Sequence, residues 1–266
     1  MHRHIFSRWR MAAAIPLTVA GIGSIVATND GGGFAPLPVV VSMSPAGVWR
    51  GTLTSDVTMS AVAVTAVITE SGTARLILDN GSQLVGSVTT DSDHLTGDLT
   101  GITELGLQWP NNTTVASFSM DGTVAERDTI TGTYAGAGDM GTLTLSFDSV
   151  YDRASSLAVL AGQWARLDAL QNYTATFSFD GQGAIDGSDA DGCIYSGAVT
   201  VADMSVDVYT VALTVENCPA SGVNLNGQYA GGGVLTDETP GSNQNDVFVL
   251  GVSNDQFVIT MRLNRI

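Results

Sequence analysis

Hydrophobic and polar residues alternate along much of the chain. Tyr173, Ala175, Phe177 and Phe179 fall on one face of a predicted strand, and Thr or Ser residues separate them. The segment 257–263 repeats this pattern with Phe, Ile, Met and Leu. A period of two is the signature of a half-buried β-strand. The segment 62–68 is apolar at nearly every position, which predicts a strand that is buried on both faces.

The same criteria applied to the whole chain predict an all-β protein. Asn-Gly and Asp-Gly pairs, such as Asn80-Gly81 and Asp180-Gly181, mark turns between several strands. Connections are too short for crossover helices, so neighbouring strands must be antiparallel. An eight-stranded meander removes its exposed edges by closing into a barrel. We expect sixteen strands, eight in each of two barrels, near 47–55, 59–69, 73–79, 83–90, 95–103, 113–125, 129–135, 141–148, 163–168, 173–180, 184–187, 193–202, 206–217, 223–235, 246–252 and 256–264.

A short helical segment separates the two predicted barrels. It covers 152–161, where Ser155 or Ser156 can cap the helix and Gly162 can end it. The predicted organisation is a signal peptide at 1–27, a Gly/Pro-rich linker at 28–45, a first barrel at 46–150, a connector at 151–161 and a second barrel at 162–266.

Two short signatures recur in the two halves. A Gly-x-Trp motif ends at Trp49 and again at Trp164, and a Gly-x-Tyr motif ends at Tyr134 and again at Tyr229. The order and the spacing of the motifs are similar in both halves. We interpret the chain as a diverged internal repeat.

The N-terminus has the features of a targeting segment. Arg3, Arg8 and Arg10 precede seventeen residues, 11–27, that carry no charge. A basic region followed by an apolar stretch is typical of a secretory signal peptide, and we expect cleavage after Ala27. The alternative is a retained membrane anchor, although this stretch has the minimum length for a membrane span. Both interpretations place the folded part outside the cytoplasm, in the periplasm, on the cell surface or secreted.

Composition and charge exclude several classes of protein. The 266 residues carry a formal charge of −16, contain 31 Gly and have no Lys. A coiled coil or helical bundle would need Ala, Leu, Glu and Lys in quantity. Nucleic-acid binding needs a basic surface, which this acidic protein lacks. The hydrophobic content of 44% argues against a disordered chain.

Cys193 and Cys218 are the only cysteines. In an exported chain two cysteines most simply form a disulfide. They flank two predicted strands, and the turn between those strands lies at 203–206, so an antiparallel hairpin would place them opposite each other. Cys218 nevertheless has the parity of the polar face of its strand. A bulge, or mixed faces in this part of the barrel, would reconcile the two observations.

Three carboxylates cluster at Asp186, Asp189 and Asp191. Oxygen ligands at this density can bind calcium, but Asp and Gly are also the usual residues of a hairpin tip. The turn is the simpler interpretation, and the calcium site is the alternative. Asp91, Asp93 and His94 are a weaker candidate for a metal site.

Catalytic groups are scarce. His94 is the only histidine beyond the predicted signal peptide, and no Lys is present to act as a base or to form a Schiff base. No Gly-x-Ser-x-Gly motif surrounds a serine. Paired carboxylates are the remaining enzymatic option. We expect a protein that is not an enzyme and that needs no cofactor apart from the possible calcium.

The Gly-x-Trp motif at the start of each barrel resembles that of the calycin superfamily, the lipocalins and avidins. In that superfamily an Arg on or after the last strand packs across the Trp and closes one end of the barrel. The resemblance implies Arg153 as the partner of Trp49 and Arg265 as the partner of Trp164. The chain also resembles uncharacterised Gly/Thr-rich bacterial envelope proteins, although it has no lipoprotein Cys near Ala27.

The expected function is therefore a binding or structural role in the cell envelope or at the surface, with a macromolecule as the partner. One alternative is a lipocalin-like carrier with a small apolar ligand inside one barrel, which an open cavity would favour. Another is an inhibitor of a secreted enzyme, with the loop at 105–114 as its reactive element. Contact with a membrane is expected only through a retained N-terminal segment.

Overall fold

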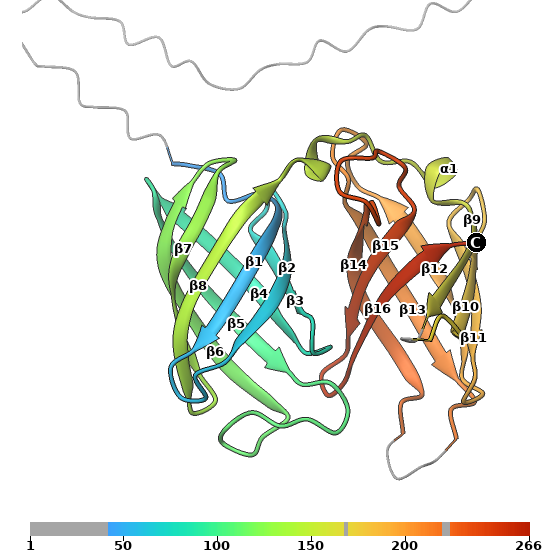
Figure 1. The fold of residues 1–266 in the computed structure, drawn as a ribbon, viewed down its shortest axis with the longest axis horizontal. Helices are drawn as coiled ribbons and strands as arrows, with labels where there is room; N and C mark the ends of the chain where they lie inside the picture. Colours follow the sequence, from blue (N-terminus) through green and yellow to red (C-terminus); the bar gives the residue numbers. More distant parts are fainter. Residues whose placement is uncertain (1–41, 168–169, 220–223) are drawn as a thin grey trace, which may run out of the picture. The chain divides into compact units, whose positions relative to one another are not determined.

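The computed structural model describes residues 42–167, 170–219 and 224–266. Within them the chain forms two closed antiparallel barrels of eight strands each (Figure 1). Each strand pairs with the next strand along the chain, and the last strand of each barrel pairs with its first. The predicted fold class, two tandem eight-stranded meander barrels, is confirmed. The predicted signal peptide and most of the linker lie outside the described residues.

The first barrel contains the strands predicted for 46–150. In chain order they are β1 (Gly47–Ser55), β2 (Ala61–Ile68), β3 (Thr73–Leu78), β4 (Gln83–Asp91), β5 (His94–Ile102), β6 (Val115–Ala125), β7 (Thr129–Gly136) and β8 (Asp139–Asp148).

The second barrel contains the strands predicted for 162–266. They are β9 (Gly162–Leu167), β10 (Tyr173–Phe179), β11 (Ala184–Asp189), β12 (Ile194–Val201), β13 (Tyr209–Glu216), β14 (Gly227–Thr236), β15 (Val247–Ser253) and β16 (Val258–Arg265).

Apolar residues with a period of two fill the inside of both barrels. Leu76, Leu84, Leu95 and Ile130 in the first barrel are at most 1% exposed. Strand β2 is apolar on both faces because each face packs against a different core. Its residues Val64, Ala66 and Ile68 belong to the core of the first barrel, while Val67 belongs to a separate cluster that also contains residues of β14 and β15. That cluster is a small apolar core between the barrels.

The connector is less helical than predicted. A 3-10 turn, η1 (Ser149–Asp152), is followed by a single α-helical turn, α1 (Leu157–Leu160). The Ser156 side chain caps α1 by accepting a hydrogen bond from the Val159 amide at 3.1 Å. The helix is short because Gly162 already begins β9, with a φ of +139° that favours glycine. None of the helices in the described part of the chain is long and apolar enough to cross a membrane.

The two Trp motifs occupy equivalent places, and the two Tyr motifs do not. Trp49 lies on the first strand of the first barrel and Trp164 on the first strand of the second, and both are fully buried. Each indole N–H donates to the carbonyl four residues earlier, at 3.0 Å for Trp49 and 2.9 Å for Trp164. Tyr134, however, lies on the seventh strand of its barrel and Tyr229 on the sixth of its barrel. The structure therefore supports a tandem repeat of the barrel. The Trp motifs occupy equivalent positions in that repeat, and the Tyr motifs do not.

Candidate functional site

One end of the first barrel is closed by aromatic packing. The ring of Trp49 meets that of Phe147 edge-on at a centroid distance of 5.4 Å, and Phe147 meets Tyr151 of η1 at 6.1 Å. Aromatic pairs in this geometry contribute stability beyond the area that they bury. Aromatic side chains therefore fill this end of the barrel.

The opposite end of the first barrel contains a cavity of about 320 Å³. Strand ends and the connections between β1 and β2, between β3 and β4 and between β5 and β6 supply its walls. The apolar part of the lining includes Leu53, Val62, Leu84 and Phe118. The volume lies at the lower end of the range for small-molecule sites, which are concave, mostly apolar and supplied with a few polar groups.

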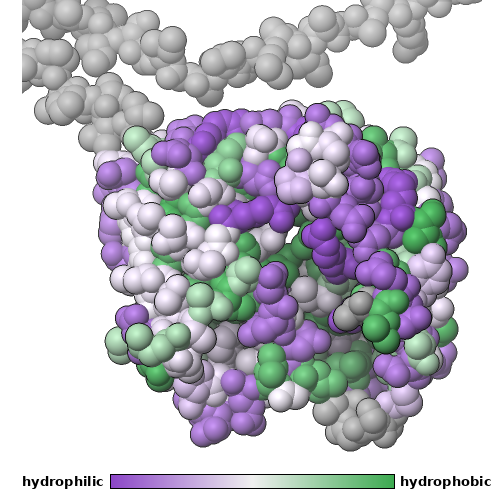
Figure 2. All heavy atoms as spheres, viewed as in Figure 1, coloured by the Kyte–Doolittle hydropathy of each residue, from purple (hydrophilic) through white to green (hydrophobic). Residues whose placement is uncertain are grey.

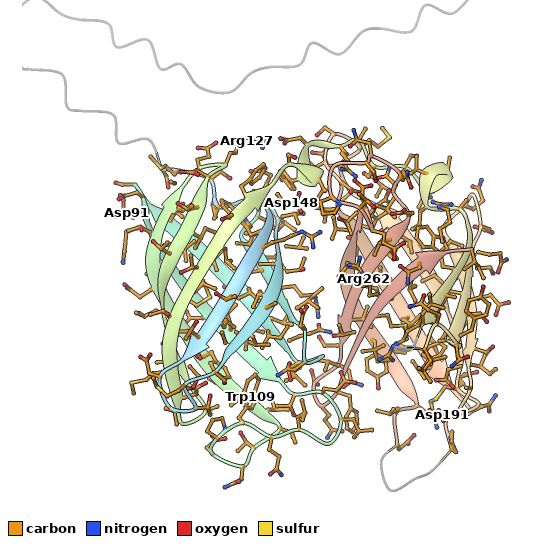
Figure 3. The ribbon with its side chains drawn as sticks, viewed as in Figure 1. Asp91, Trp109, Arg127, Asp148, Asp191 and Arg262 are labelled. Carbon is orange, nitrogen blue, oxygen red and sulfur yellow. A yellow bond between two sulfur atoms is a disulfide. The ribbon has the colours of Figure 1, made fainter. Side chains whose placement is uncertain are left out.

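Trp109 covers one side of this cavity. It belongs to the loop between β5 and β6 and is labelled in Figure 3. Its indole N–H donates to the Gly101 carbonyl at 3.3 Å, and its ring packs against Phe118 at a centroid distance of 4.9 Å. Gly101 makes this contact possible, because a Cβ there would lie 2.4 Å from the Phe118 ring and 2.9 Å from the Trp109 ring. The loop is therefore folded back onto its own barrel.

A polar triad lies at the rim of the cavity. One oxygen of Asp139 accepts hydrogen bonds from the Ser55 hydroxyl at 2.6 Å and from the Met140 amide at 2.8 Å. Its other oxygen accepts from the Tyr134 hydroxyl at 3.1 Å. Burial and the neighbouring Asp139 carboxylate raise the pKa of Tyr134 above its ordinary value. The Tyr134 phenol therefore stays protonated and donates its hydrogen to the Asp139 side chain. Towards a ligand, the Asp139 side chain acts chiefly as a hydrogen-bond acceptor.

The predicted pair of Arg265 and Trp164 is confirmed. The guanidinium carbon of Arg265 lies 4.3 Å from the centroid of the Trp164 ring. The same guanidinium donates hydrogen bonds to the carbonyls of Val159 and Ala161, the latter at 3.0 Å. Arg265 thus combines a cation–π contact with the capping of the connector helix.

The predicted pair of Arg153 and Trp49 is wrong. Arg153 forms an ion pair with Asp237 at 2.8 Å and a hydrogen bond with Asn245 at 3.0 Å. This side chain hydrogen bond with Arg153 is the main reason why the pKa of Asp237 falls to about 2. A buried carboxylate attracts a guanidinium more strongly than an indole face does, because it carries a full charge. In the first barrel the only described guanidinium over an aromatic ring is that of Arg127, 5.0 Å from the centroid of Phe147.

Cys193 and Cys218 form the predicted disulfide, with their Cα atoms 4.1 Å apart. The sequence places Cys218 on the polar face of its strand and Cys193 on the apolar face, and the local backbone explains how the two still meet. The pairing of β12 with β13 ends at Ile194 opposite Glu216, and the next residue, Asn217, adopts a left-handed φ of +59°. This conformation interrupts the alternation of the strand, so Cys218 turns towards the core where Cys193 is buried.

The three carboxylates predicted for calcium do not come together. Asp186 and Asp189 lie on β11 at positions of opposite parity, so their side chains leave opposite faces of the sheet. Asp189 instead accepts hydrogen bonds from the amides of Asp191 and Cys193 and from the Tyr195 hydroxyl. The described residues contain no cluster of three His, Cys, Asp or Glu side chains that could hold a metal ion. The turn interpretation therefore holds for this segment.

The second metal candidate is also not assembled. His94 is hydrogen-bonded to Asp121 across the β5–β6 pair at 3.1 Å, and both partners are exposed. Asp91 is the cross-strand neighbour of His94 on β4, but among the described residues they form no cluster of three metal ligands. Cross-strand neighbours that are both half-exposed form a surface contact of small energy.

Sequence analysis did not find the cavity residues. Trp109 offered a signal, because a large aromatic residue inside a Pro- and Asn-containing loop needs a packing partner. Tyr134 was noted only as part of a Gly-x-Tyr motif, and Ser55 and Asp139 offered no signal. Tyr134 and Asp139 are neighbours across the β7–β8 hairpin, and closure of the barrel between β1 and β8 brings Ser55 to them.

Comparisons with models of known protein families, with curated proteins and with solved structures find no match to this chain. The fold itself defines the class to which the chain belongs, that of proteins built from two tandem eight-stranded antiparallel barrels.

Proposed function

We propose that this is a non-catalytic, extracytoplasmic binding protein whose ligand enters the open end of the first barrel. The cavity of about 320 Å³ beside Trp109 is the observation that carries the proposal. Apolar and polar residues both line it, and Ser55, Tyr134 and Asp139 form a hydrogen-bonded group at the rim that can orient a ligand, as in small-molecule sites generally. The resemblance of the fold to calycins, with one end plugged by Trp49 and the other open, supports the same conclusion.

The chemistry of the rim favours a particular ligand class. The Asp139 carboxylate accepts three hydrogen bonds, from Ser55, Met140 and Tyr134, and a carboxylate has about four acceptor positions, so about one remains for a ligand. A ligand with a hydroxyl or ammonium group can donate to it, whereas a ligand acid would meet like charge. The preferred ligand is therefore a small apolar molecule with one hydrogen-bond donor or positive charge.

The same groups are arranged for binding and not for proton transfer. A general acid or base works best with a pKa near the operating pH. The raised pKa of Tyr134 keeps its phenol protonated at neutral pH. Ser55 donates its hydrogen to Asp139, and the pair has no His beside it among the described residues that line the cavity. This supports a non-catalytic role.

Two features support a location outside the cytoplasm. The Cys193–Cys218 disulfide is characteristic of an oxidising compartment. The basic and apolar N-terminal segment 1–27 has the composition of a signal peptide.

The inhibitor alternative receives less support. A reactive loop must present its side chains to an enzyme, yet Trp109 turns into the mouth of its own barrel. Binding of a macromolecule, or a purely structural role, is the outcome that a negative test of the cavity would indicate.

The proposal is tested by titrating the protein with 1-octylamine, 1-octanol and octanoate while the indole N–H signals are followed by NMR. The signal of Trp109 is assigned from its loss in Trp109→Phe. We expect octylamine, octanol or both to shift the Trp109 signal in a saturable way, and octanoate to bind at least about tenfold more weakly because of repulsion by Asp139.

Two variants complete the test, and their binding is measured by isothermal titration calorimetry, because Trp109→Ala has no Trp109 signal to follow. Trp109→Ala removes one wall of the cavity and should abolish saturable binding, whereas Tyr173→Ala, an exposed aromatic on β10, should leave it unchanged. Melting temperatures of both variants verify that they are folded. If none of the three compounds shifts the Trp109 signal, or if Trp109→Ala binds them as the parent does, the cavity is not the binding site.

A further inference from the structure

A second and larger cavity, a cleft of about 670 Å³, lies outside the barrel interiors. Strands β1, β2 and β3 of the first barrel form one wall, and β9, β15 and β16 of the second barrel form the other. The cleft is visible as a hollow near the middle of the face shown in Figure 2, with strongly hydrophilic residues at its border. It shares Leu78 and Asn80 with the cavity beside Trp109, but none of its Arg residues lines that cavity.

The floor of the cleft is held together by a buried amide. Gln83 on β4 is fully buried, and its side-chain nitrogen donates to the Thr260 hydroxyl at 2.7 Å and to the Ile259 carbonyl at 3.2 Å. The Thr260 hydroxyl in turn donates to the Gly81 carbonyl at 2.8 Å. Arg75 donates to the Gln83 side-chain oxygen and, at 3.1 Å, to the Ala230 carbonyl. The two walls are therefore fixed relative to each other at this point.

The walls also meet at a second place. Arg50 on β1 donates to the Thr236 hydroxyl on β14 at 2.8 Å. Val48 of β1 shares a buried apolar cluster with Val234 and Val247 of the second barrel. With contacts at two separate places, the cleft is a preformed cavity, so a ligand would spend little binding energy on ordering it.

The cleft wall on the second barrel comes from an incomplete strand pair. Within the described residues, β16 pairs with β9 at two positions, Asn264 with Ala165 and Arg265 with Trp164. By contrast, β1 and β8 pair at eight positions in the first barrel. Past Ala165 the strands β9 and β16 separate, and Arg166 and Leu167 line the cleft. This separation is what exposes Arg166 there.

Positive charge is concentrated in the cleft. Beyond residue 27 the chain has seven Arg and 26 acidic residues. Three of those Arg, at 50, 166 and 262, line the cleft, against two acids, Asp79 and Glu104. The balance of charge is thus reversed relative to the rest of this acidic protein.

The Arg side chains keep donors for a ligand. Arg50 uses its Nε for Asp148 and one terminal nitrogen for Thr236, which leaves the other terminal nitrogen. Arg262, labelled in Figure 3, forms no ion pair with any residue that the structure describes. Burial raises the pKa of Glu104 and the charge of Arg166 lowers it, so the field of Arg166 reaches across the cleft.

We propose that this cleft is a binding site for a small organic anion that carries a carboxylate or phosphate group together with hydroxyl groups. The guanidinium groups of Arg166 and Arg262 would hold the oxyanion, since planar guanidinium donors match carboxylate and phosphate oxygens. The hydroxyl of Thr65 and the amides of Asn80 and Asn264 line the same cleft and can bond the hydroxyl groups of the ligand. The inference does not depend on the function proposed for the first barrel.

The experiment is isothermal titration calorimetry of the intact protein with three probes. Digalacturonate supplies carboxylates, glucose 6-phosphate supplies a phosphate, and cellobiose is the neutral control. We expect saturable binding of at least one anion, with weaker binding at about 0.15 M salt, where the Debye length falls to about 8 Å, than at low salt. The anion that binds identifies the acidic group, and cellobiose should give no saturable heat.

Matched variants locate the site. Arg166→Gln with Arg262→Gln should weaken the binding at least about tenfold, because charge-assisted hydrogen bonds are the strong ones in anion recognition. Arg127→Gln removes the same charge from a surface pair with Asp152, outside the cleft, and should leave the affinity unchanged. Trp109→Ala should also leave it unchanged, which separates this test from that of the first barrel. Failure of both anions to bind, equal binding of cellobiose, or unchanged binding in the double variant would each overturn the proposal.

Discussion

Asp207 is a buried carboxylate with little hydrogen bonding. It is 2% exposed, and neither of its oxygens has a well-formed hydrogen bond with a described residue, although the Leu235 amide lies near enough to lower its pKa. Burial raises its pKa to about 7, although the Leu235 amide and the charge of Arg153 lower it, and the charges of Asp148 and Asp237 raise it further. An ionised carboxylate in such a place destabilises the folded state.

Because of Asp207, we expect the free energy of unfolding to decrease as the pH rises. The folded state retains the Asp207 proton up to about pH 7, whereas the unfolded chain loses it near pH 4. The folded state therefore binds more protons in this window, so its contribution to the free energy of unfolding decreases from about pH 4 to about pH 7 and is constant above.

Asp207→Asn removes this titration. We expect the variant to be about 1–3 kcal/mol more stable than the parent at pH 8, because the loss of a buried charge outweighs the burial of an unpaired amide. Near pH 4 the two proteins should be equally stable. Urea unfolding at a series of pH values measures the difference, and a difference that does not change with pH would contradict the raised pKa.

At the scale of elements, the hairpin of β12 and β13 is the most constrained part of the second barrel. The disulfide closes its open end across a separation of 25 residues. A loop of this length stabilises the folded state by roughly 3.5 kcal/mol in the chain-entropy model. The disulfide stabilises the second barrel in particular, because both cysteines and the strands between them lie in it.

Cys193→Ser with Cys218→Ser should therefore lower the free energy of unfolding by about 2–4 kcal/mol. Hydrogen exchange should show the loss of protection first in β12 and β13, while β1 to β8 stay protected. Equal loss of protection in both barrels would mean that the disulfide acts on the whole molecule. Free-thiol labelling of the native parent protein should find no reactive cysteine.

The whole molecule depends on the contacts between its two barrels. Gln83 links β4 to β16 through buried hydrogen bonds, and Arg75 beside it has a pKa lowered to about 10 by burial. Removing the Gln83 amide leaves several buried polar partners unsatisfied, and each unsatisfied group costs about 1–3 kcal/mol.

Gln83→Leu is thus expected to reduce stability by about 2–4 kcal/mol and to split one unfolding transition into two. Differential scanning calorimetry distinguishes a single peak from two. Gln228→Leu, at an exposed position on β14, is the matched control and should keep the parent profile. A single unchanged transition in Gln83→Leu would show that the barrels are coupled by other contacts.

Local pattern alone determined the strands, their order and the barrel class. Alternation along 173–179 and turn pairs such as Asn80-Gly81 act between near neighbours, so they can be read without the fold. The spacing of Cys193 and Cys218 about a predicted turn was sufficient for the same reason. The pairing of Arg265 with Trp164 came instead from the resemblance to calycins. In a meander, each strand pairs with the next strand along the chain, so residues that are close in sequence are also close in space.

Tertiary structure alone decided the sites. Arg153 was assigned to Trp49 from the resemblance to calycins, but a carboxylate from the other barrel, that of Asp237, binds it. At the rim of the first barrel Ser55 is distant in sequence from Tyr134 and Asp139, and the Arg residues of the cleft also come from strands far apart in sequence. Their proximity depends on barrel closure and on contacts between the barrels, such as that of Gln83 with Thr260. Such long-range pairings leave no periodic trace in a single sequence, because periodicity reports only which face of its own strand a residue occupies.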